Sequence, residues 1–449
     1  MFFIFKVITL TLSSRHGYKI NSANIIMKSN KTLLSIAVAC GLITTSAFVN
    51  AAGFQLAEYS ATGLGRAYAG EAAMADNSSA QWRNPAMLTY LEGTQISVGG
   101  IYVNPNVDVE GTVTHQQLGK THASSNDFAH DAVIPNFYLS HQLNEQVVLG
   151  FALGTNYGME TDLGTEFAAS HFGNQASVIS KEANLNIAYQ ILPQLSIGGG
   201  VRYVMGEGHF GATAPAKNAL TLSQGTTLKY MEGEDEAWGW QAGTAWQINQ
   251  QHRIGFAYKS KVVMDFEGHA KGVSYGTYKP GMMSVTLPAT AELASLHQIN
   301  KQWAIHASVN WTDWSSFKEL TAVFPEKSDL IKSENWEDNY RFALGTTYQY
   351  DAKIALRAGV AYDTSAVDDK NRTATIPETD RTWLSIGGSY VATPQLTLDA
   401  GFTYIFAKDA TINEPRDASD QTAALIGGAF TGEVSGNVWL IGVQANYTF

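Results

Sequence analysis

Apolar and polar residues alternate along most of the chain, most clearly in its last twelve residues, Val438–Phe449. The odd-numbered positions from Trp439 to Phe449 are apolar or aromatic, whereas the even-numbered positions from Gly442 to Thr448 are glycine or polar. A period of two residues is that of a β-strand whose two faces meet different surroundings. The chain is therefore expected to end in a strand with one apolar and one polar face.

About fourteen segments with this alternation follow one another from residue 94 onward. Each fits the ~10 residues that a tilted barrel strand needs to cross a bilayer. They start near Thr94, Ala132, Val147, Lys181, Leu195, Ala237, His252, Ser284, Gln302, Asn339, Lys353, Arg381, Gln395 and Val438.

The connections between these segments are short and long in turn. Six are tight, at residues 144–146, 193–194, 249–251, 300–301, 351–352 and 393–394. The intervening ones are long and polar, as at residues 104–131, 206–236, 312–338 and 406–437. This order puts the short turns and both chain ends at one rim and the long loops at the other, which is the topology of outer-membrane barrels.

These patterns predict an all-β fold, a 14-stranded antiparallel transmembrane β-barrel formed by residues 94–449. Bilayer hydrocarbon leaves no backbone polar group unpaired, and a closed sheet meets that demand without a helix. A soluble β-sandwich would also have short alternating strands. It has no reason to alternate its connection lengths or to place aromatic residues at strand ends, as at Trp303, Trp311 and Tyr340.

Residues 52–93 show a different pattern, crowded with alanine and glycine and without strand alternation. Short helical turns separated by glycines are expected here. Pro85 biases Asn84 away from the helical region and removes a donor, so a sharp exit into the first strand is expected. We interpret residues 52–93 as a small N-terminal helical hatch that plugs the lumen of the barrel.

The first 51 residues are predicted to be a signal peptide. A short basic run begins at Met27, an apolar stretch follows from Leu33 to Phe48, and small residues precede Ala52. The natural start is expected at Met27, with a mature chain beginning at Ala52. Cys40, the single cysteine, falls inside this leader, so the mature chain has no disulfide or thiolate metal site.

Composition and charge narrow the class further. Only 15% of the residues are charged, 11% are aromatic and 41 are glycine. Residues 1–51 hold five Lys or Arg and no Asp or Glu, which leaves 24 basic against 40 acidic residues, a net charge of −16. Such a surface repels nucleic acid, and an acidic ligand would have to be held by local groups and apolar contact.

Three stretches carry a resemblance to a known family. They are Ala52-Gly53-Phe54-Gln55-Leu56 with residues 63–71, then Arg83-Asn84-Pro85-Ala86, and then residues 302–306, 340–348 and 371–381 taken in order. Together they resemble the long-chain fatty acid transporters of Gram-negative outer membranes, the OMPP1/FadL/TodX type. The resemblance implies uptake of long-chain fatty acids by ligand-gated lateral diffusion through a gap in the barrel wall. A sibling branch that imports aromatic hydrocarbons is the alternative.

The resemblance also assigns residues. Asn84, Pro85 and Ala86 match the family's hatch motif, and Phe54 would reach into the ligand pocket, either as a gate or as an anchor of the tail. An inward kink of the third strand would open the wall. Glycine inside a strand marks bulges or close approach, so Gly154, Asn156 and Gly158 are the candidate kink; alternatively, these glycines merely fill a crowded wall.

Charged residues on the polar faces of the later strands are candidate lumenal groups. They are Arg341, Arg357, Asp363, Asp399 and the mid-strand His306. One hypothesis pairs an arginine with the carboxylate of the ligand, because guanidinium matches that group with two hydrogen bonds. The other hypothesis is an ion-pair network that holds the hatch through Arg66, Glu71, Asp76 and Arg83.

The resemblance has a weak point in the fifth strand. Where the family places basic residues near the ligand head group, this chain has Glu207-Gly208-His209. The loops at residues 206–236 and 265–283, which would shape an outer docking groove, are short but keep apolar residues. The preferred ligand therefore stays open between fatty acids and uncharged hydrocarbons.

The sequence does not indicate an enzyme. A phospholipase or protease barrel would need a nucleophile with histidine and an acid, and no such pattern occurs. A plug of forty residues does not fit an open porin. No cofactor or metal is expected. The expected partners are hydrophobic small molecules, the bilayer and lipopolysaccharide, and the barrel assembly machinery during biogenesis, with the chain acting as a monomer.

Overall fold

The computed structural model describes residues 53–416 and 420–449. The predicted signal peptide, with Met27 and Cys40, lies outside these residues, as does Ala52. None of the helices in the described part is long and apolar enough to cross a membrane.

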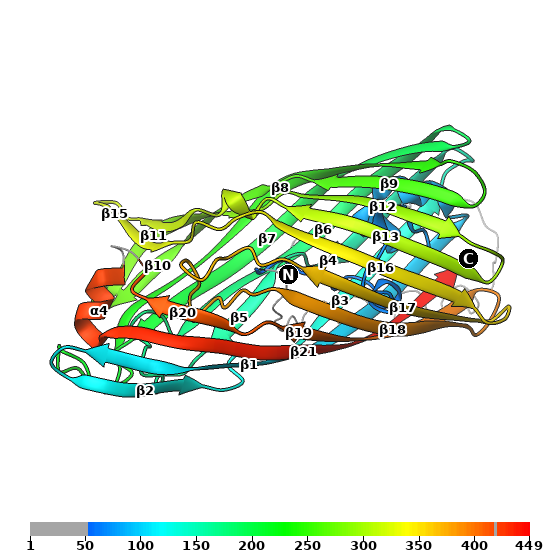
Figure 1. Ribbon diagram of the computed structural model, residues 1–449. Helices are drawn as coiled ribbons and strands as arrows, with labels where there is room; N and C mark the ends of the chain where they lie inside the picture. The colour runs from blue at the N-terminus through cyan, green and yellow to red at the C-terminus, as the bar shows by residue number, and fades with distance from the viewer. Residues whose placement is uncertain (1–52, 417–419) are drawn as a thin grey trace, which may run out of the picture. The chain divides into compact units, whose positions relative to one another are not determined.

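Fourteen strands form a closed antiparallel ring, which confirms the predicted fold (Figure 1). Each ring strand pairs with the next, and the last pairs with the first. In chain order they are β1 (Thr94–His115), β3 (Ala132–Gln142), β4 (Val147–Gly154), β6 (Gln175–Leu192), β7 (Leu195–Thr213), β8 (Thr227–Gln247), β9 (His252–Lys259), β12 (Thr290–Gln298), β13 (Trp303–Thr312), β16 (Asn339–Gln349), β17 (Ile354–Asp363), β18 (Arg381–Val391), β19 (Leu396–Ala407) and β21 (Ala429–Thr448).

The ring is closed by the two ends of the barrel sequence. β1 and β21 pair in one unbroken register, from Gln95 opposite Thr448 to Thr114 opposite Ala429. Closure leaves neither strand as a free edge, which bilayer hydrocarbon requires. The alternation seen in Val438–Phe449 is therefore that of the closing strand.

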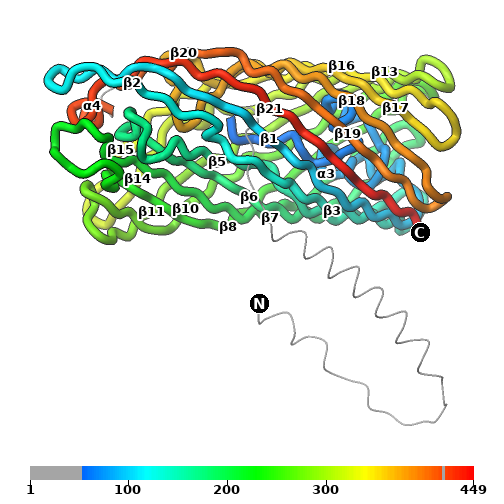
Figure 2. The backbone as a smooth tube through the Cα atoms, turned by 90° about the horizontal axis from the view of Figure 1, so that it is seen from below, coloured from blue at the N-terminus to red at the C-terminus, as the bar shows by residue number. Residues whose placement is uncertain are grey.

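The short turns and the C-terminus lie at one end of the barrel, and the longer connections lie at the other (Figures 1 and 2). Additional strands extend the wall at the second end. They are β2 (Gly119–Ser125), β5 (Gly158–Asp162), β10 (Val262–Gly272), β11 (Gly276–Leu287), β14 (Glu319–Val323), β15 (Ser328–Ser333) and β20 (Ala410–Glu414), with helix α4 (Gln421–Gly427) and the 3-10 turn η4 (Trp314–Ser316) beside them.

Several strands begin earlier or later than the alternation predicts. β8 starts at Thr227 rather than near Ala237, because a run of glycine and acidic residues without alternation still pairs with β7. The segment expected from Ser284 is two strands, β11 and β12, interrupted at Pro288, which cannot donate to a ladder. Beyond the bilayer both faces of a strand meet water, so alternation no longer marks its ends.

The outer face of the ring is apolar, whereas the inner face mixes small, polar and buried apolar side chains. Large apolar side chains remain exposed around the outside, among them Leu185, Ile187, Trp238, Trp240, Ile386 and Val443. These are the alternate positions of their strands, so they form the lipid-facing surface of the barrel.

The hatch consists of four short helical pieces inside the ring. They are α2 (Ala61–Leu64), the 3-10 helix η2 (Glu71–Ala73), α3 (Ala80–Arg83) and the 3-10 helix η3 (Pro85–Tyr90). Their side chains are almost all buried against the inner wall. Glycines of the wall allow the close approach: a Cβ added at Gly359 would lie 2.1 Å from the carbonyl oxygen of Arg66, and one at Gly255 would lie 1.9 Å from that of Ala72.

Candidate functional site

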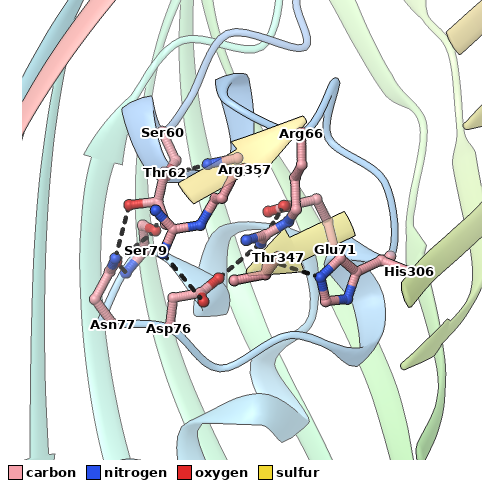
Figure 3. Close-up of polar contacts among 12 residues, drawn as sticks. Ser60, Thr62, Arg66, Glu71, Asp76, Asn77, Ser79, His306, Thr347 and Arg357 are labelled. Atoms are coloured by element: carbon pink, nitrogen blue, oxygen red, sulfur yellow. Dashed lines mark hydrogen bonds and ion pairs between the residues drawn. The ribbon is translucent and has the colours of Figure 1, made fainter. Parts of the chain in front are cut away.

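Arg66 is the centre of a buried ion-pair network between the hatch and the wall (Figure 3). One guanidinium nitrogen, Nη2, lies 2.6 Å from Glu71 Oε1 and 2.7 Å from Asp76 Oδ2. Arg357 of β17 lies on the other side of Asp76, with Nη2 3.9 Å from Oδ1. The hatch is thus tied by charge to the strands around it.

Arg357 and Arg341 are both engaged within the described residues. Arg357 Nη1 lies 3.4 Å from Asp399 Oδ1. Arg341 Nη1 lies 3.3 Å from Asp363, and its Nη2 donates to the carbonyl oxygen of Ala67 in the hatch at 2.9 Å. This arrangement is what the ion-pair hypothesis expects, and it leaves neither arginine open to a ligand.

The remaining predicted lumenal groups also contact hatch or wall. Arg83 Nε lies 3.1 Å from Glu292 Oε2. His306 shares a hydrogen bond of 2.9 Å between Nε2 and Thr347 Oγ1, and a Cβ added at Gly70 of the hatch would lie 2.8 Å from that of His306. His306 therefore packs against the hatch and hydrogen-bonds to the neighbouring strand.

The hatch motif forms a hydrogen-bonded corner at the entry to η3. Asn84 Nδ2 donates to the carbonyl oxygens of Ala72 at 2.6 Å and Thr244 at 3.0 Å, while its Oδ1 accepts from Ala86 N at 3.0 Å. Pro85 occupies the first position of η3, where a missing N–H costs nothing. Asn84 therefore joins two hatch segments to β8.

The candidate kink lies at a break in the wall. β4 ends at Gly154 and β5 begins at Gly158. β3 pairs with β1 from Ala132 onward, but with β4 only from Phe137 onward. In the half of the wall nearer the long loops, β3 is thus not paired with the segment 155–157, and the ladder resumes only as an isolated bridge between Ala129 and Thr161.

Instead of pairing with β3, the segment 155–157 pairs with the start of the hatch. Leu56 N donates to Asn156 O at 2.7 Å, Gly158 N donates to Phe54 O at 2.8 Å, and Gln55 and Tyr157 form an antiparallel bridge. Tyr157 then reaches the opposite wall, because its hydroxyl donates to Pro288 O at 2.7 Å.

Phe54 lies in an aromatic cluster on the loop side of the hatch. Its ring centroid is 4.6 Å from that of Trp314, 5.5 Å from that of Phe317 and 6.0 Å from that of Trp336. Phe54 also borders a cavity of about 100 Å³ with mostly apolar walls. Other residues of that wall include Met159, Phe210, Met231, Phe266, Met283 and Phe324.

Lys332 borders the same cavity but is not among the residues predicted from the sequence. Its side chain is buried, and Nζ contacts Thr375 Oγ1 at 3.3 Å and lies 5.1 Å from the centroid of the Phe210 ring. Among the described residues no carboxylate oxygen lies within 4.0 Å of that nitrogen. The surrounding alternation in residues 328–333 resembles any loop hairpin, so no sequence signal marks it.

Buried carboxyl groups surround this end of the molecule. Burial raises the pKa of Glu334, and it raises the pKa of Glu378 to about 7 although Arg381 and the Gly53 amide oppose the shift. The described part of the chain holds no group of three or more His, Cys, Asp or Glu side chains placed to bind a metal.

The chain is similar to known outer-membrane proteins. A family described as "Outer membrane protein transport protein (OMPP1/FadL/TodX)" matches residues 42–449. A "Long-chain fatty acid transport protein" of Escherichia coli O6:H1 is 33% identical, and an "Outer membrane protein P1" of Haemophilus influenzae is 34% identical; both matches cover 94% of this chain and 100% of the relative.

Solved structures share the fold. A FadL homologue of Pseudomonas aeruginosa aligns with a TM-score of 0.80 at 20% identity, over 89% of this chain and 100% of that one. The toluene transporter TodX of Pseudomonas putida aligns with a TM-score of 0.65 at 16% identity, over 87% and 99%. Both likenesses show the architecture alone.

Proposed function

Because the chain belongs to the OMPP1/FadL/TodX family of outer membrane transport proteins, we propose that it takes up long-chain fatty acids and releases them sideways through the break in its wall. The family match confirms the predicted location in a Gram-negative outer membrane and a transport protein rather than an enzyme. That the chain acts as a monomer and is inserted by the barrel assembly machinery stays a prediction.

The observation that carries the proposal is that Phe54 links the apolar cavity to the wall break. Phe54 borders the cavity with its ring, while its carbonyl oxygen accepts the hydrogen bond from Gly158 at the edge of the break. A ligand that displaces Phe54 therefore acts on the backbone that shapes the opening. This contact gives a physical means by which an occupied cavity can open the exit.

Exit through the wall also fits the energetics of an acyl chain. Each buried methylene contributes ~0.8 kcal/mol relative to water. A path through an aqueous lumen into the periplasm would lose this contribution, and the hatch fills the lumen below the cavity. Passage from an apolar cavity into the bilayer keeps the chain out of water throughout.

Lys332 favours an acid over an uncharged hydrocarbon. Its ammonium group has no carboxylate oxygen within 4.0 Å among the described residues, although Glu334 borders the same mostly apolar cavity, so it can pair with the head group of a fatty acid. Import of aromatic hydrocarbons is the second candidate, supported by the aromatic side chains that line the cavity and by the family description, which includes TodX.

Uptake by cells tests the proposal. A strain without its own fatty acid transporter, carrying this gene, is given labelled oleate or labelled toluene. Oleate uptake well above the empty vector supports the proposal, and Lys332→Met is expected to reduce it about tenfold, the value of one charge-assisted hydrogen bond. Uptake of toluene without oleate would replace it by the hydrocarbon function.

A further inference from the structure

A second buried amino group, Lys259, lies behind the wall break. It is the last residue of β9, its side chain is 6% exposed, and Nζ contacts Asn156 Oδ1 at 3.2 Å. The same nitrogen lies 4.3 Å from the centroid of the Trp82 ring in the hatch. Lys259 therefore contacts the segment 155–157, which interrupts the wall, through the side chain of Asn156.

The carboxylate nearest to Asn156 is already occupied. Glu182 accepts from Arg202 through both oxygens, at 2.8 Å from Nε to Oε1 and 2.7 Å from Nη2 to Oε2. The amide of Asn156 also donates to Glu182. No ion pair within 4.0 Å joins Lys259 to a carboxylate among the described residues.

Lys259, Glu182 and Arg202 together carry one net positive charge when Lys259 is protonated. Glu182 and Arg202 compensate each other, and the nearby Arg83 is compensated by Glu292 at 3.1 Å. Taking an uncompensated charge out of water is costly, and an anion placed beside it recovers part of that cost. Asn156 offers Lys259 only the partial charge of an amide oxygen.

We propose that Lys259 receives the carboxylate of the ligand at the wall break, in place of the Asn156 amide oxygen, and thereby makes the exit selective for acids. The proposal rests on the fatty acid function above and names a second basic station on the path. Lys332 would meet the carboxylate in the cavity and Lys259 at the opening. An uncharged hydrocarbon or ester gains nothing from Lys259.

A matched pair of ligands tests the proposal. Oleate and methyl oleate have the same chain and differ in the charge of the head group. Binding of each to purified protein and uptake of each by cells are measured for the wild type, Lys259→Met and Lys259→Arg. Lys353→Met, in an exposed turn at the opposite rim, is the matched control.

Lys259→Met is expected to weaken oleate binding and uptake about tenfold, the worth of a charge-assisted hydrogen bond, and to change methyl oleate less than twofold. Lys259→Arg keeps the charge and is expected to retain at least about half of the oleate uptake. Equal losses for both ligands would show that Lys259 only holds the kink, and no loss for oleate would remove it from the path.

Glu182→Gln gives an independent result if Lys259→Met does not fold. The substitution keeps the shape of the side chain and raises the local positive charge, so the ratio of oleate to methyl oleate binding is expected to rise. An unchanged or lower ratio would contradict the proposal. Absence of oleate uptake by the wild type would instead contradict the proposed function, which this ratio does not measure.

Discussion

The backbone nitrogen of Gly158 donates a hydrogen bond of 2.8 Å to the carbonyl oxygen of Phe54. Gly158 is the first residue of β5, beyond the break in the wall, and Phe54 lies near the start of the hatch. The wall opening and the start of the plug are thus hydrogen-bonded to each other rather than being separate devices.

Bulky residues at the break are expected to slow uptake and leave the barrel folded. A Cβ at Gly154 would lie 3.1 Å from the Trp82 ring, and one at Gly158 would lie 3.1 Å from Leu56. Gly154→Leu and Gly158→Leu therefore fill the space between the hatch and the opening. Oleate uptake is measured in cells, and folding is checked by the heat-dependent mobility of the barrel on gels.

Gly100→Leu is the control for these variants, because a Cβ there has no neighbour closer than 3.8 Å. Its uptake should match that of the wild type. Normal uptake in both break variants would remove the kink assignment and favour glycines that merely fill a crowded wall.

Truncation of Phe54 is expected to weaken ligand binding about ten- to a hundredfold, because loss of one buried aromatic from a cavity wall removes ~1.5–3 kcal/mol of apolar contact. The ring is 1% exposed and stacks edge-on against Trp314. Binding of oleate to purified Phe54→Ala is the measurement. Phe406→Ala is the control, because Phe406 lies on the lipid-facing side and is 49% exposed; this variant should bind oleate as the wild type does. If Phe54→Ala also bound oleate with wild-type affinity, Phe54 would lie outside the ligand pocket.

Loss of Arg66 is expected to loosen the hatch. Arg66→Met leaves Glu71 and Asp76 without their guanidinium, and breaking a buried pair costs ~3–5 kcal/mol. Small sugars should then cross liposomes that contain the variant, as measured by swelling. Lys408→Met is the control: it breaks a pair whose lysine is 72% exposed, worth ~0–1 kcal/mol, so liposomes with this variant should not admit sugars. If liposomes with Arg66→Met also excluded sugars, apolar packing alone would hold the hatch.

Asn84→Asp is expected to cause leakage of the same kind. Aspartate cannot donate to the carbonyl oxygens of Ala72 and Thr244, and leaving such buried groups unpaired costs ~1–3 kcal/mol each. Asn249→Asp is the matched control, since its Oδ1 only accepts, from Gln251 and His252 in a turn. Comparable swelling rates for the two variants would contradict the anchoring role of Asn84.

Glu378 is expected to make the loop region less stable as the pH rises. Burial raises its folded-state pKa to about 7, above the unfolded value, so the folded state holds a proton that the unfolded state releases. The stabilisation is fully present below the unfolded pKa near 4.5 and is lost as the pH rises through about 7. The thermal midpoint of Glu378→Gln should therefore fall less between pH 4.5 and about 7 than that of the wild type. If both proteins showed the same fall, a group other than Glu378 would cause it.

The alternation of apolar and polar residues along the sequence was sufficient to predict the barrel. Lipid on one side and a filled lumen on the other impose a period of two on each strand, and the membrane imposes its length. The even count and the alternating connections then fixed the topology, as the β1 to β21 register shows. Asn84, Pro85 and Arg66 could be placed in the hatch because their motifs are contiguous in the chain.

The partners of the charged side chains were decided by the tertiary structure. Arg341 and Lys332 are both basic residues in or beside strands, and no local pattern distinguishes them. Arg341 meets Asp363 and the hatch across the lumen, whereas Lys332 meets an apolar cavity. Which charge is paired depends on residues brought together from distant parts of the chain. Only closure of the barrel around the hatch leaves Lys259 and Lys332 without a carboxylate oxygen within 4.0 Å in the described ranges 53–416 and 420–449.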